Sequence, residues 1–376
     1  MKKILFVFGT RPEAIKMAMP ILELKKRKNV EVKICVSGQH RELLDGVLDV
    51  FEITPDYDLN IMKHGQDLAD ISSKIMLGLR NVFNDFPADI VATHGDTTTA
   101  FIASLAAYYQ KIKVAHIEAG LRTNNIYSPF PEEGNRKMID AISSYLFAPT
   151  EINKNALLAE NIDKENIFVV GNSVVDALLE MKKRIETNED LRKNILENIK
   201  NAGYLLAENR KIVLITTHRR ENIGKNLENI YESIKILAQK HTDTDFLVVL
   251  HPNPVLFQTI SPIVSKISNI KLLKNVDYYS FMFLMSKSYI IMTDSGGIQE
   301  EAPSFGVPVF VLRDTTERPE GIECGVAKML GTESDFIIKK IDEILTNPKI
   351  HKDMSGKPSP YGDGKTAARI ADILEK

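Results

Sequence analysis

Residues 4–16 of the chain read ILFVFGTRPEAIK, and they contain a strand, a loop and the start of a helix. The continuous apolar run from Ile4 to Phe8 is typical of a strand that is covered on both faces. Thr10 and Glu13, just beyond this run, have the spacing of a helix capping box. A buried strand that leads directly into a capped helix predicts a parallel α/β sheet.

The same alternation of apolar run, loop and helical spacing recurs along the chain in two series. The strands expected in the first series span residues 4–8, 32–36, 90–93, 114–117, 145–148 and 167–170. Those expected in the second series span residues 212–216, 246–250, 270–273, 289–292 and 307–312. Because strands that alternate with helices form parallel sheets, we expect two doubly wound α/β domains. They would span residues 1–172 and 173–360, and a terminal helix would follow in residues 361–376.

The composition excludes several classes of protein. Of the 376 residues, 44% are hydrophobic and 26% are charged, close to the globular average of about 25% charged. The 48 basic and 50 acidic side chains leave a net charge of −2, so no overall positive field exists to hold nucleic acid or an anionic membrane. No apolar stretch approaches the roughly 18 residues that a membrane span requires.

Cysteine, histidine and glycine patterns argue against a metal site and against a dinucleotide cofactor. Cys35 and Cys324 are the only cysteines, lie far apart in the sequence and fit a reducing cytoplasm. The motifs GxGxxG and HExxH are both absent, and the histidines that follow strands lack metal-ligand spacing. We therefore expect no metal, no cofactor and a cytoplasmic location.

Ligands of parallel α/β sheets bind at the carboxyl ends of the strands, so the residues after each apolar run are the informative ones. Arg11 and Lys16 follow the first run, near a helix N-terminus that itself favours anions. They are candidates for binding an anionic ligand. The simpler alternative is a capped helix with two solvated cations.

Three carboxylates follow later runs of the first series. Asp96 lies in HGDTTT (residues 94–99), Glu118 in HIEAGLR (116–122) and Glu132 in PFPEEGNR (129–136). Each one alone could be a helix cap or half of a surface ion pair. Because neighbouring strand ends are adjacent in space, three together predict convergence on one acid/base site.

The second series offers groups suited to a nucleotide. THRREN (residues 217–222) follows its first strand and DSGGIQEE (294–301) follows its fourth. Gly296 and Gly297, preceded by Ser295 as the cap, would let backbone amides approach a diphosphate closely. Glu301 could accept two hydrogen bonds from a ribose diol. The alternative for the glycine pair is an ordinary tight connection.

At these positions the sequence resembles the non-hydrolysing UDP-N-acetylglucosamine 2-epimerases of bacteria. The matching motifs are GTRPEAIKMA (9–18), GQHR (38–41), HGDTTTA (94–100), HIEAGLRT (116–123), PEEGNR (131–136), THRREN (217–222), DSGGIQEEAP (294–303), RDTTERPEG (313–321) and PYGDGK (360–365). The resemblance implies two Rossmann-like domains facing a cleft, as in the glycosyltransferase-B group. The C-terminal helix would pack back on the N-terminal domain, and the protein would be a homodimer.

The resemblance also implies the reaction, which is reversible inversion at C2 to give UDP-N-acetylmannosamine for cell-surface polysaccharide. The C2 proton is not adjacent to a carbonyl, so direct deprotonation would leave an unstabilised carbanion. The family is understood to eliminate UDP, form 2-acetamidoglucal and add UDP back with a proton on the opposite face. UDP-N-acetylglucosamine and UDP are the implied small-molecule partners, without nucleic acid or membrane.

Residue roles follow from the matching motifs. Asp96, Glu118 and Glu132 would form the acid/base set, with at least one carboxylate for each face of C2. His218 would hold the diphosphate and stabilise charge as the glycosidic C–O bond breaks. The remaining implied substrate contacts are Arg11 and Lys16 at the diphosphate, Arg136 at the glutamate loop, Ser295, Gly296 and Gly297 at phosphate, Glu301 at ribose, Phe281 at the uracil face, the backbone near Val276 at the uracil edge, and Arg318.

Some bacterial members bind a second UDP-N-acetylglucosamine as an activator. The resemblance places Gln39 and His40 at this effector site. Residues 62–68, which would supply an arginine to it, read MKHGQDL and contain none. This departure leaves effector regulation an open question.

Four alternatives share parts of this pattern. A hydrolysing epimerase would release free N-acetylmannosamine and UDP through the same glycal, although the residues 9–16 motif argues against it. A glycosyltransferase would need paired glutamates, but no glutamate lies eight residues after Glu300 or Glu301. A non-catalytic nucleotide-sugar sensor would not need three carboxylates. A 2-epimerase for a modified UDP-2-acetamido sugar would need the same three carboxylates.

Overall fold

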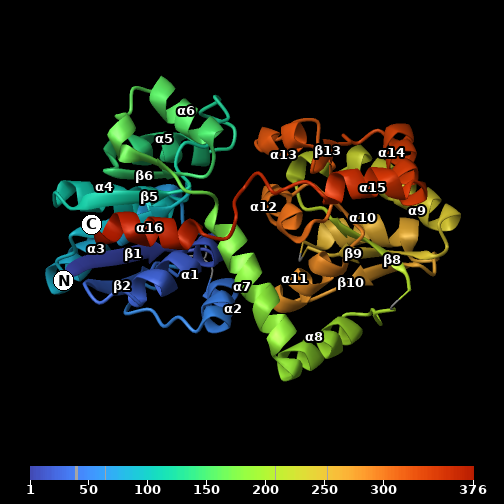
Figure 1. Cartoon of the computed structure of the whole chain (residues 1–376), viewed down its shortest axis with the longest axis horizontal. Coiled ribbons are helices and arrows are strands. Elements are labelled where there is room, and N and C mark those ends of the chain that lie inside the picture. The colour runs from blue at the N-terminus through green and yellow to red at the C-terminus, as the bar shows by residue number, and fades with distance from the viewer. Residues whose placement is uncertain (39–40, 64, 208, 252) are drawn as a thin grey trace. The chain divides into compact units, whose positions relative to one another are not determined.

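The computed structural model describes residues 1–38, 41–63, 65–207, 209–251 and 253–376, and the chain divides into two compact units (Figure 1). The first unit is Met1–Ala177 together with Tyr361–Lys376, and the second is Leu178–Pro360. Helix α7, Ser173–Thr187, passes from the first unit into the second. The predicted α/β class with two doubly wound parallel sheets is confirmed.

The first unit contains a seven-stranded sheet, within the described residues, in the order β3-β2-β1-β4-β5-β6-β7. Every pair of neighbouring strands is parallel. Its strands are β1 Lys2–Phe8, β2 Val30–Val36, β3 Tyr57–Asp58, β4 Ile90–His94, β5 Lys113–Ile117, β6 Tyr145–Ala148 and β7 Ile167–Val169. Its helices are α1 Arg11–Lys25, α2 Arg41–Phe51, α3 Leu68–Asp85, α4 Thr98–Tyr109, α5 Glu132–Ile142, α6 Glu151–Ala159, the short η1 Lys164–Asn166 and α16 Thr366–Glu375.

The second unit contains a six-stranded parallel sheet in the order β10-β9-β8-β11-β12-β13, again within the described residues. Its strands are β8 Lys211–Thr216, β9 Thr244–Val249, β10 Ile270–Leu273, β11 Ile290–Thr293, β12 Val309–Val311 and β13 Ala327–Met329. Its helices are α8 Glu189–Asn201, η2 Arg220–Asn222, α9 Lys225–Lys240, α10 Pro254–Val264, α11 Tyr278–Lys287, α12 Gly296–Glu301, η3 Ala302–Phe305, α13 Pro319–Cys324, α14 Ser334–Thr346 and α15 Pro348–Ser355.

Apolar side chains on both faces of the sheets form the cores, as continuous apolar strands require. Residues Ile4 to Phe8 of β1 are fully buried. Helix α4 is alanine-rich, and its small side chains pack against the central strands of the first sheet. Tyr231 of α9 lies in the core of the second unit. Among the described residues, no helix is long and apolar enough to cross a membrane.

The C-terminal helix α16 belongs to the first unit, where it packs against α1 (Figure 1). The buried Asp176 accepts the backbone N–H groups of Thr366 and Ala367 at 3.2 and 2.9 Å. It thereby caps the N-terminus of α16, whose first amides have no partner within the helix. Ile370 and Leu374 of this helix are fully buried.

Each sheet changes winding direction at one pair of strands, and this position determines where the polar loops gather. The order of the first sheet reverses between β1 and β4, and that of the second reverses between β8 and β11. At such a switch point the connecting helices leave on opposite faces, so the loops at the strand ends enclose a crevice. Residues 9–16, 95–99, 217–222 and 294–301 follow these four strands, and residues 118–136 follow the neighbouring β5.

Candidate active site

The loops after β1 and β4 are joined by one buried carboxylate, that of Glu13. Its Oε2 accepts the backbone N–H groups of Gly9 and Thr10 at 3.1 and 2.8 Å, and its Oε1 accepts the Thr97 hydroxyl at 2.8 Å. The capping box predicted at Thr10 and Glu13 is therefore present. Burial raises the pKa of Glu13, although these hydrogen bonds oppose the rise.

Lys16 and Glu118 form an ion pair across the same sheet end. Lys16 is buried, so it is not the solvated cation of the simpler alternative, whereas Arg11 is half-buried at the first turn of α1. The Glu118 Oε2 atom also accepts the Asn172 amide at 3.2 Å and lies 3.6 Å from His94 Nε2.

The backbone of Glu118 has a φ of 70°, in the left-handed region that non-glycine residues seldom adopt. Such strain persists only where surrounding contacts maintain it, and it is concentrated at functional sites. The Lys16 and Asn172 contacts supply that support at the side chain. Two backbone N–H groups, from Glu118 and Ala119, supply it by donating to the Phe147 carbonyl at 3.1 Å.

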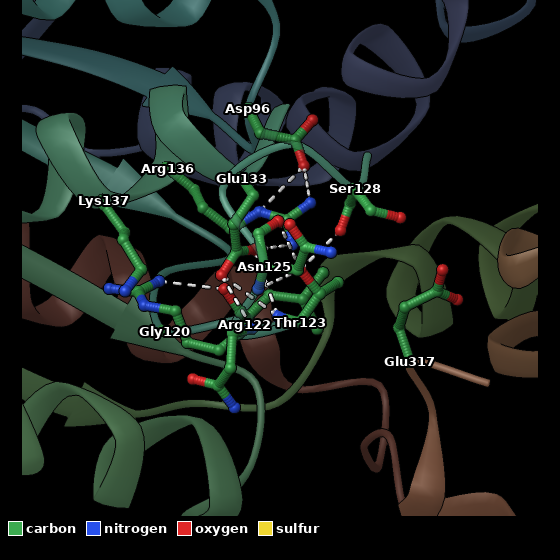
Figure 2. A network of polar contacts seen from close by, with 12 residues as sticks. Asp96, Gly120, Arg122, Thr123, Asn125, Ser128, Glu133, Arg136, Lys137 and Glu317 are labelled. Atoms are coloured by element: carbon green, nitrogen blue, oxygen red, sulfur yellow. Dashed lines mark hydrogen bonds and ion pairs between the residues drawn. The ribbon is translucent and has the colours of Figure 1, made fainter. Parts of the chain in front are cut away.

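Asp96 and Arg136 form the second ion pair of this region (Figure 2). The Arg136 Nε donates to Asp96 at 3.1 Å, and its Nη1 donates to the fully buried Glu133 at 2.9 Å. Asn135 donates to the Asp96 carbonyl at 2.8 Å. The first turns of α5, which begins at Glu132, therefore hold the Asp96 loop.

The two adjacent glutamates of α5 have different environments. Glu133 is fully buried and accepts the backbone N–H groups of Thr123 and Asn124 at 3.1 Å, in addition to Arg136. Glu132 is half-buried, and its Oε2 atom has no hydrogen-bond partner among the described residues. Glu133 therefore maintains the loop, and Glu132 is the glutamate suited to chemistry.

A third buried network lies behind the Asp96 and Glu118 loops. His116 contacts the Asp140 carboxylate through Nδ1 at 2.5 Å and the Gly95 carbonyl through Nε2 at 2.7 Å. Asp140 also accepts the Gly120 N–H at 3.2 Å and lies 2.7 Å from the Arg122 guanidinium. This network connects the residue before Asp96 to the segment that follows Glu118.

In the second unit, the loops after β8 and β11 meet at Asp294. The Asp294 carboxylate is fully buried and accepts the backbone N–H of His218, the backbone N–H of Arg219 and the side-chain amide of Asn222, each at 3.0 Å. Burial acts to raise the pKa of Asp294, but the hydrogen bonds from His218 and Arg219 hold it below its usual value.

The glycine pair after Asp294 begins helix α12, with Ser295 as the N-cap residue. A Cβ atom at Gly296 would lie 3.5 Å from the Arg318 guanidinium carbon, and one at Gly297 would lie 3.7 Å from the Glu301 carboxylate. Arg318 donates to the buried Glu300 at 2.7 Å. The backbone of this turn is thus flanked by one cation and one carboxylate.

The structure therefore gathers the predicted site residues into two groups, one in each unit. Phe281 lies on α11 and Val276 in the loop before it, both half-buried. Gln39 and His40, the predicted effector residues, lie outside the described residues. Within the described residues no cluster of histidine, cysteine, aspartate and glutamate could hold a metal ion.

Reasoning from sequence missed several residues that hold the site together, namely Asn172, Glu133, Asp140 and Asp294. For two of them, the position in the sequence could have indicated a role. Asp294 directly follows a buried strand, as Asp96 nearly does, and Glu133 adjoins Glu132. Asn172 and Asp140 had no such indication, because their partners are 54 and 24 residues away in the chain.

Two doubly wound parallel units, each with polar loops at its switch point, define an α/β protein of the glycosyltransferase-B type. The family model for UDP-N-acetylglucosamine 2-epimerase matches residues 22–375, and the chain belongs to this family. A Campylobacter jejuni UDP-N-acetylglucosamine 2-epimerase is 48% identical over 375 residues, which cover 100% of this chain and 98% of the relative.

Solved structures agree with this assignment. The UDP-GlcNAc 2-epimerase of Neisseria meningitidis, bound to UDP-GlcNAc, is 48% identical, covers 99% of each chain and has a TM-score of 0.91. The enzyme of Methanocaldococcus jannaschii, in complex with UDP-GlcNAc and UDP, is 35% identical, covers 99% of each chain and has a TM-score of 0.83.

The ion pair between Glu160 and Arg122 generates a prediction about pH. Arg122 donates to both Glu160 oxygens, at 2.9 and 2.6 Å, and these hydrogen bonds lower the pKa of Glu160 to about 2. A lowered carboxylate pKa stabilises the fold above the ordinary value near 4.5, and that stability is lost as the pH falls toward about 2. Glu160→Gln should therefore lower the free energy of unfolding by about 1 kcal/mol at pH 7.

Urea unfolding followed by circular dichroism at pH 7 and pH 3 measures this difference. We expect it to shrink at pH 3. Glu151→Gln, at an exposed pair with Lys154 on the same helix α6, is the control and should change little at either pH. An equal loss for Glu160→Gln at both pH values would contradict the assigned charge interaction.

Proposed function

We propose that this protein interconverts UDP-N-acetylglucosamine and UDP-N-acetylmannosamine by inverting C2 of the sugar. One observation carries the proposal within the epimerase family. Asp96, Glu118 and Glu132 lie at the carboxyl end of one sheet, and buried cations or helix contacts hold their loops in place. The relatives' names and the bound UDP-GlcNAc of the Neisseria meningitidis structure support the choice of substrate.

The chemistry explains why carboxylates and a diphosphate site are needed together. A carboxylate removes the C2 proton while the C1–O bond breaks, and the electron pair of that bond leaves with UDP. The product is 2-acetamidoglucal, with a C1–C2 double bond. UDP then adds back to C1 as a carboxylic acid delivers a proton to the opposite face of C2. The proposal assigns these proton transfers to Asp96, Glu118 and Glu132.

The second unit would bind the UDP portion. Ser295, Gly296 and Gly297 present backbone N–H groups at the start of α12, and Arg318 flanks this turn, in support of a phosphate contact. In this proposal Glu301 binds the ribose diol and His218 stabilises the departing diphosphate. Two further contacts are proposed at the base, Phe281 at the uracil face and the backbone near Val276 at its edge.

The remaining substrate contacts belong to the first unit. We assign Arg11 and Lys16 to the diphosphate and Arg136 to positioning of the glutamate loop. The contacts of Arg136 with Asp96 and Glu133 support that role. The ion pair with Glu118 places the Lys16 ammonium beside one of the three assigned carboxylates. A cytoplasmic location is part of the proposal, since Cys35 and Cys324 are both free.

A proton NMR time course in deuterated water tests the reaction directly. Purified protein with UDP-N-acetylglucosamine, without metal, cofactor or acceptor, should accumulate UDP-N-acetylmannosamine in a stable mixture with deuterium at C2. Release of free N-acetylmannosamine and UDP would identify the hydrolysing reaction instead. If neither product forms, the same assay with UDP-linked 2-acetamido sugars modified at C3 or C6 tests a different substrate.

Single substitutions test the acid/base assignment. Asp96→Asn, Glu118→Gln and Glu132→Gln should each lower turnover by about 100-fold or more, because each removes a group that transfers a proton. UDP affinity, measured by isothermal titration calorimetry, should stay within about threefold, because these three carboxylates are assigned to proton transfer at the sugar and not to binding of UDP. Glu151→Gln, on the exposed face of α6, is the control. Wild-type rates in all three variants would overturn the assignment.

We also propose that the protein is a homodimer. Large apolar side chains are exposed on three helices, of which α4 packs against both α3 and α5, namely Leu77 on α3, Tyr108 and Tyr109 on α4 and Met138 on α5. Exposed apolar side chains on neighbouring helices support an interface there. Sedimentation velocity should give a dimer of 42.3 kDa chains. The double change Tyr108→Glu and Tyr109→Glu should yield monomer, whereas Leu205→Glu, at an exposed site in the second unit, should not. A wild-type monomer would contradict the proposal.

A further inference from the structure

The carboxylate of Asp294 is organised around His218. Asp294 is fully buried after β11, and the His218 backbone N–H donates to both of its oxygens at 3.0 Å. Arg219 and Asn222 donate to Oδ2, also at 3.0 Å. Of these three donors, only the His218 backbone N–H reaches Oδ1. The His218 ring contacts the same oxygen.

The contact between ring and carboxylate determines which ring nitrogen carries a proton. His218 Nδ1 lies 3.2 Å from Asp294 Oδ1. An ionised carboxylate can only accept a hydrogen bond, so the favourable arrangement places a proton on Nδ1. Nε2, on the opposite side of the ring, is then the nitrogen that interacts with a ligand. About a third of the His218 side chain is exposed, so the ring is accessible from the loop surface.

Other titratable groups around this pair are His251 and Tyr231. The His251 ring stacks on the His218 ring with 5.9 Å between centroids. Partial burial lowers the pKa of His251, and the charge on His218 lowers it further. On the α9 side the buried Tyr231 bonds Thr217 at 2.9 Å, and burial raises its pKa, so this phenol stays neutral. Of the two stacked imidazoles, His218 is the one with a ring nitrogen 3.2 Å from the Asp294 carboxylate.

We propose that Asp294 is the positioning residue for His218, keeping a proton on Nδ1 and stabilising the imidazolium that presents Nε2–H to the departing diphosphate. This inference rests on the proposed function for the role of the diphosphate, but not for the state of the ring. It extends the assignment of His218 to a carboxylate that is fully buried behind the ring. The arrangement parallels the use of a buried carboxylate to set imidazole tautomer and charge in hydrolases.

The substitution Asp294→Asn tests the role of the carboxylate charge, because asparagine has nearly the same side-chain shape as aspartate. The amide oxygen can occupy the Oδ2 position and accept from His218, Arg219 and Asn222, which keeps the loop closed. The amide NH₂ then occupies the Oδ1 position and donates toward His218 Nδ1. The neutral ring must accept there, so its proton moves to Nε2, and the imidazolium loses its anionic partner.

Ring NMR on protein labelled with ¹⁵N-histidine reads the state of the ring without any activity. His218→Asn identifies the His218 signals among the eight histidines. In wild-type protein above neutral pH we expect the proton on Nδ1, and in Asp294→Asn we expect it on Nε2. Unchanged His218 signals in the folded variant would overturn the inference, whatever the reaction is.

Kinetics then separate positioning from a structural role. For Asp294→Asn we expect kcat to fall about 100-fold at pH 8, the scale of one lost charge-stabilising group, with KM within about threefold. The fall in kcat at alkaline pH should also begin at lower pH than in wild type. Asp245→Asn is the matched control, because Asp245 is a buried carboxylate of the same unit that pairs with Arg210 and Tyr204.

The outcomes are distinct. If Asp245→Asn shifts the pH profile as far as Asp294→Asn does, the effect belongs to loss of any buried carboxylate and the inference is wrong. If wild-type protein shows the expected ring state but no epimerisation, the proposed function fails and the Asp294–His218 relation stands. Circular dichroism confirms that each variant is folded.

Discussion

Burial of charge at the carboxyl end of the first sheet is the constraint on which the candidate site depends. An isolated ion in a protein interior costs several kcal/mol, so each buried charge needs a partner of opposite sign with good geometry. Lys16 with Glu118, Arg136 with Asp96 and Glu133, and Arg122 with Asp140 meet this requirement. Removal of either partner would leave the other charge buried without a counter-ion. These pairs therefore hold the loops at the strand ends in one arrangement.

This arrangement agrees with what proton transfer at a carbon requires. In the reaction that we propose, the carboxylates that transfer protons must be held rigidly, since a displacement of about 1 Å at a reacting centre can lower the rate by about 100-fold. The strained backbone of Glu118 and the Asn135 contact to the Asp96 carbonyl are both local features of this rigidity. The energetic cost of strain and charge burial is compatible with stability because the two parallel sheets supply large apolar cores.

Much of this could be predicted from the sequence, and the exceptions have physical causes. Continuous apolar runs located the central strands, because strands covered on both faces leave no other pattern. Strands β3 and β13 were not predicted, because neither YD in β3 nor AKM in β13 is a continuous apolar run. The burial of Lys16 could not be foreseen either, because its partner Glu118 is 102 residues away. Likewise, nothing in the letters EE distinguishes the buried Glu133 from Glu132, and only the fold separates them.

Asp96 and Glu118 in the first unit and Asp294 in the second unit are stabilised in different ways, and the difference has a chemical consequence. In the first unit, arginine and lysine side chains form ion pairs with Asp96, Glu118 and Asp140. In the second unit, Asp294 is held by N–H donors that carry no net charge, apart from the His218 ring. A negative charge satisfied by neutral donors remains able to stabilise a proton on the neighbouring imidazole. In the reaction that we propose, the first unit would move protons on and off carbon, and the second would offer a cation at the moment the diphosphate departs.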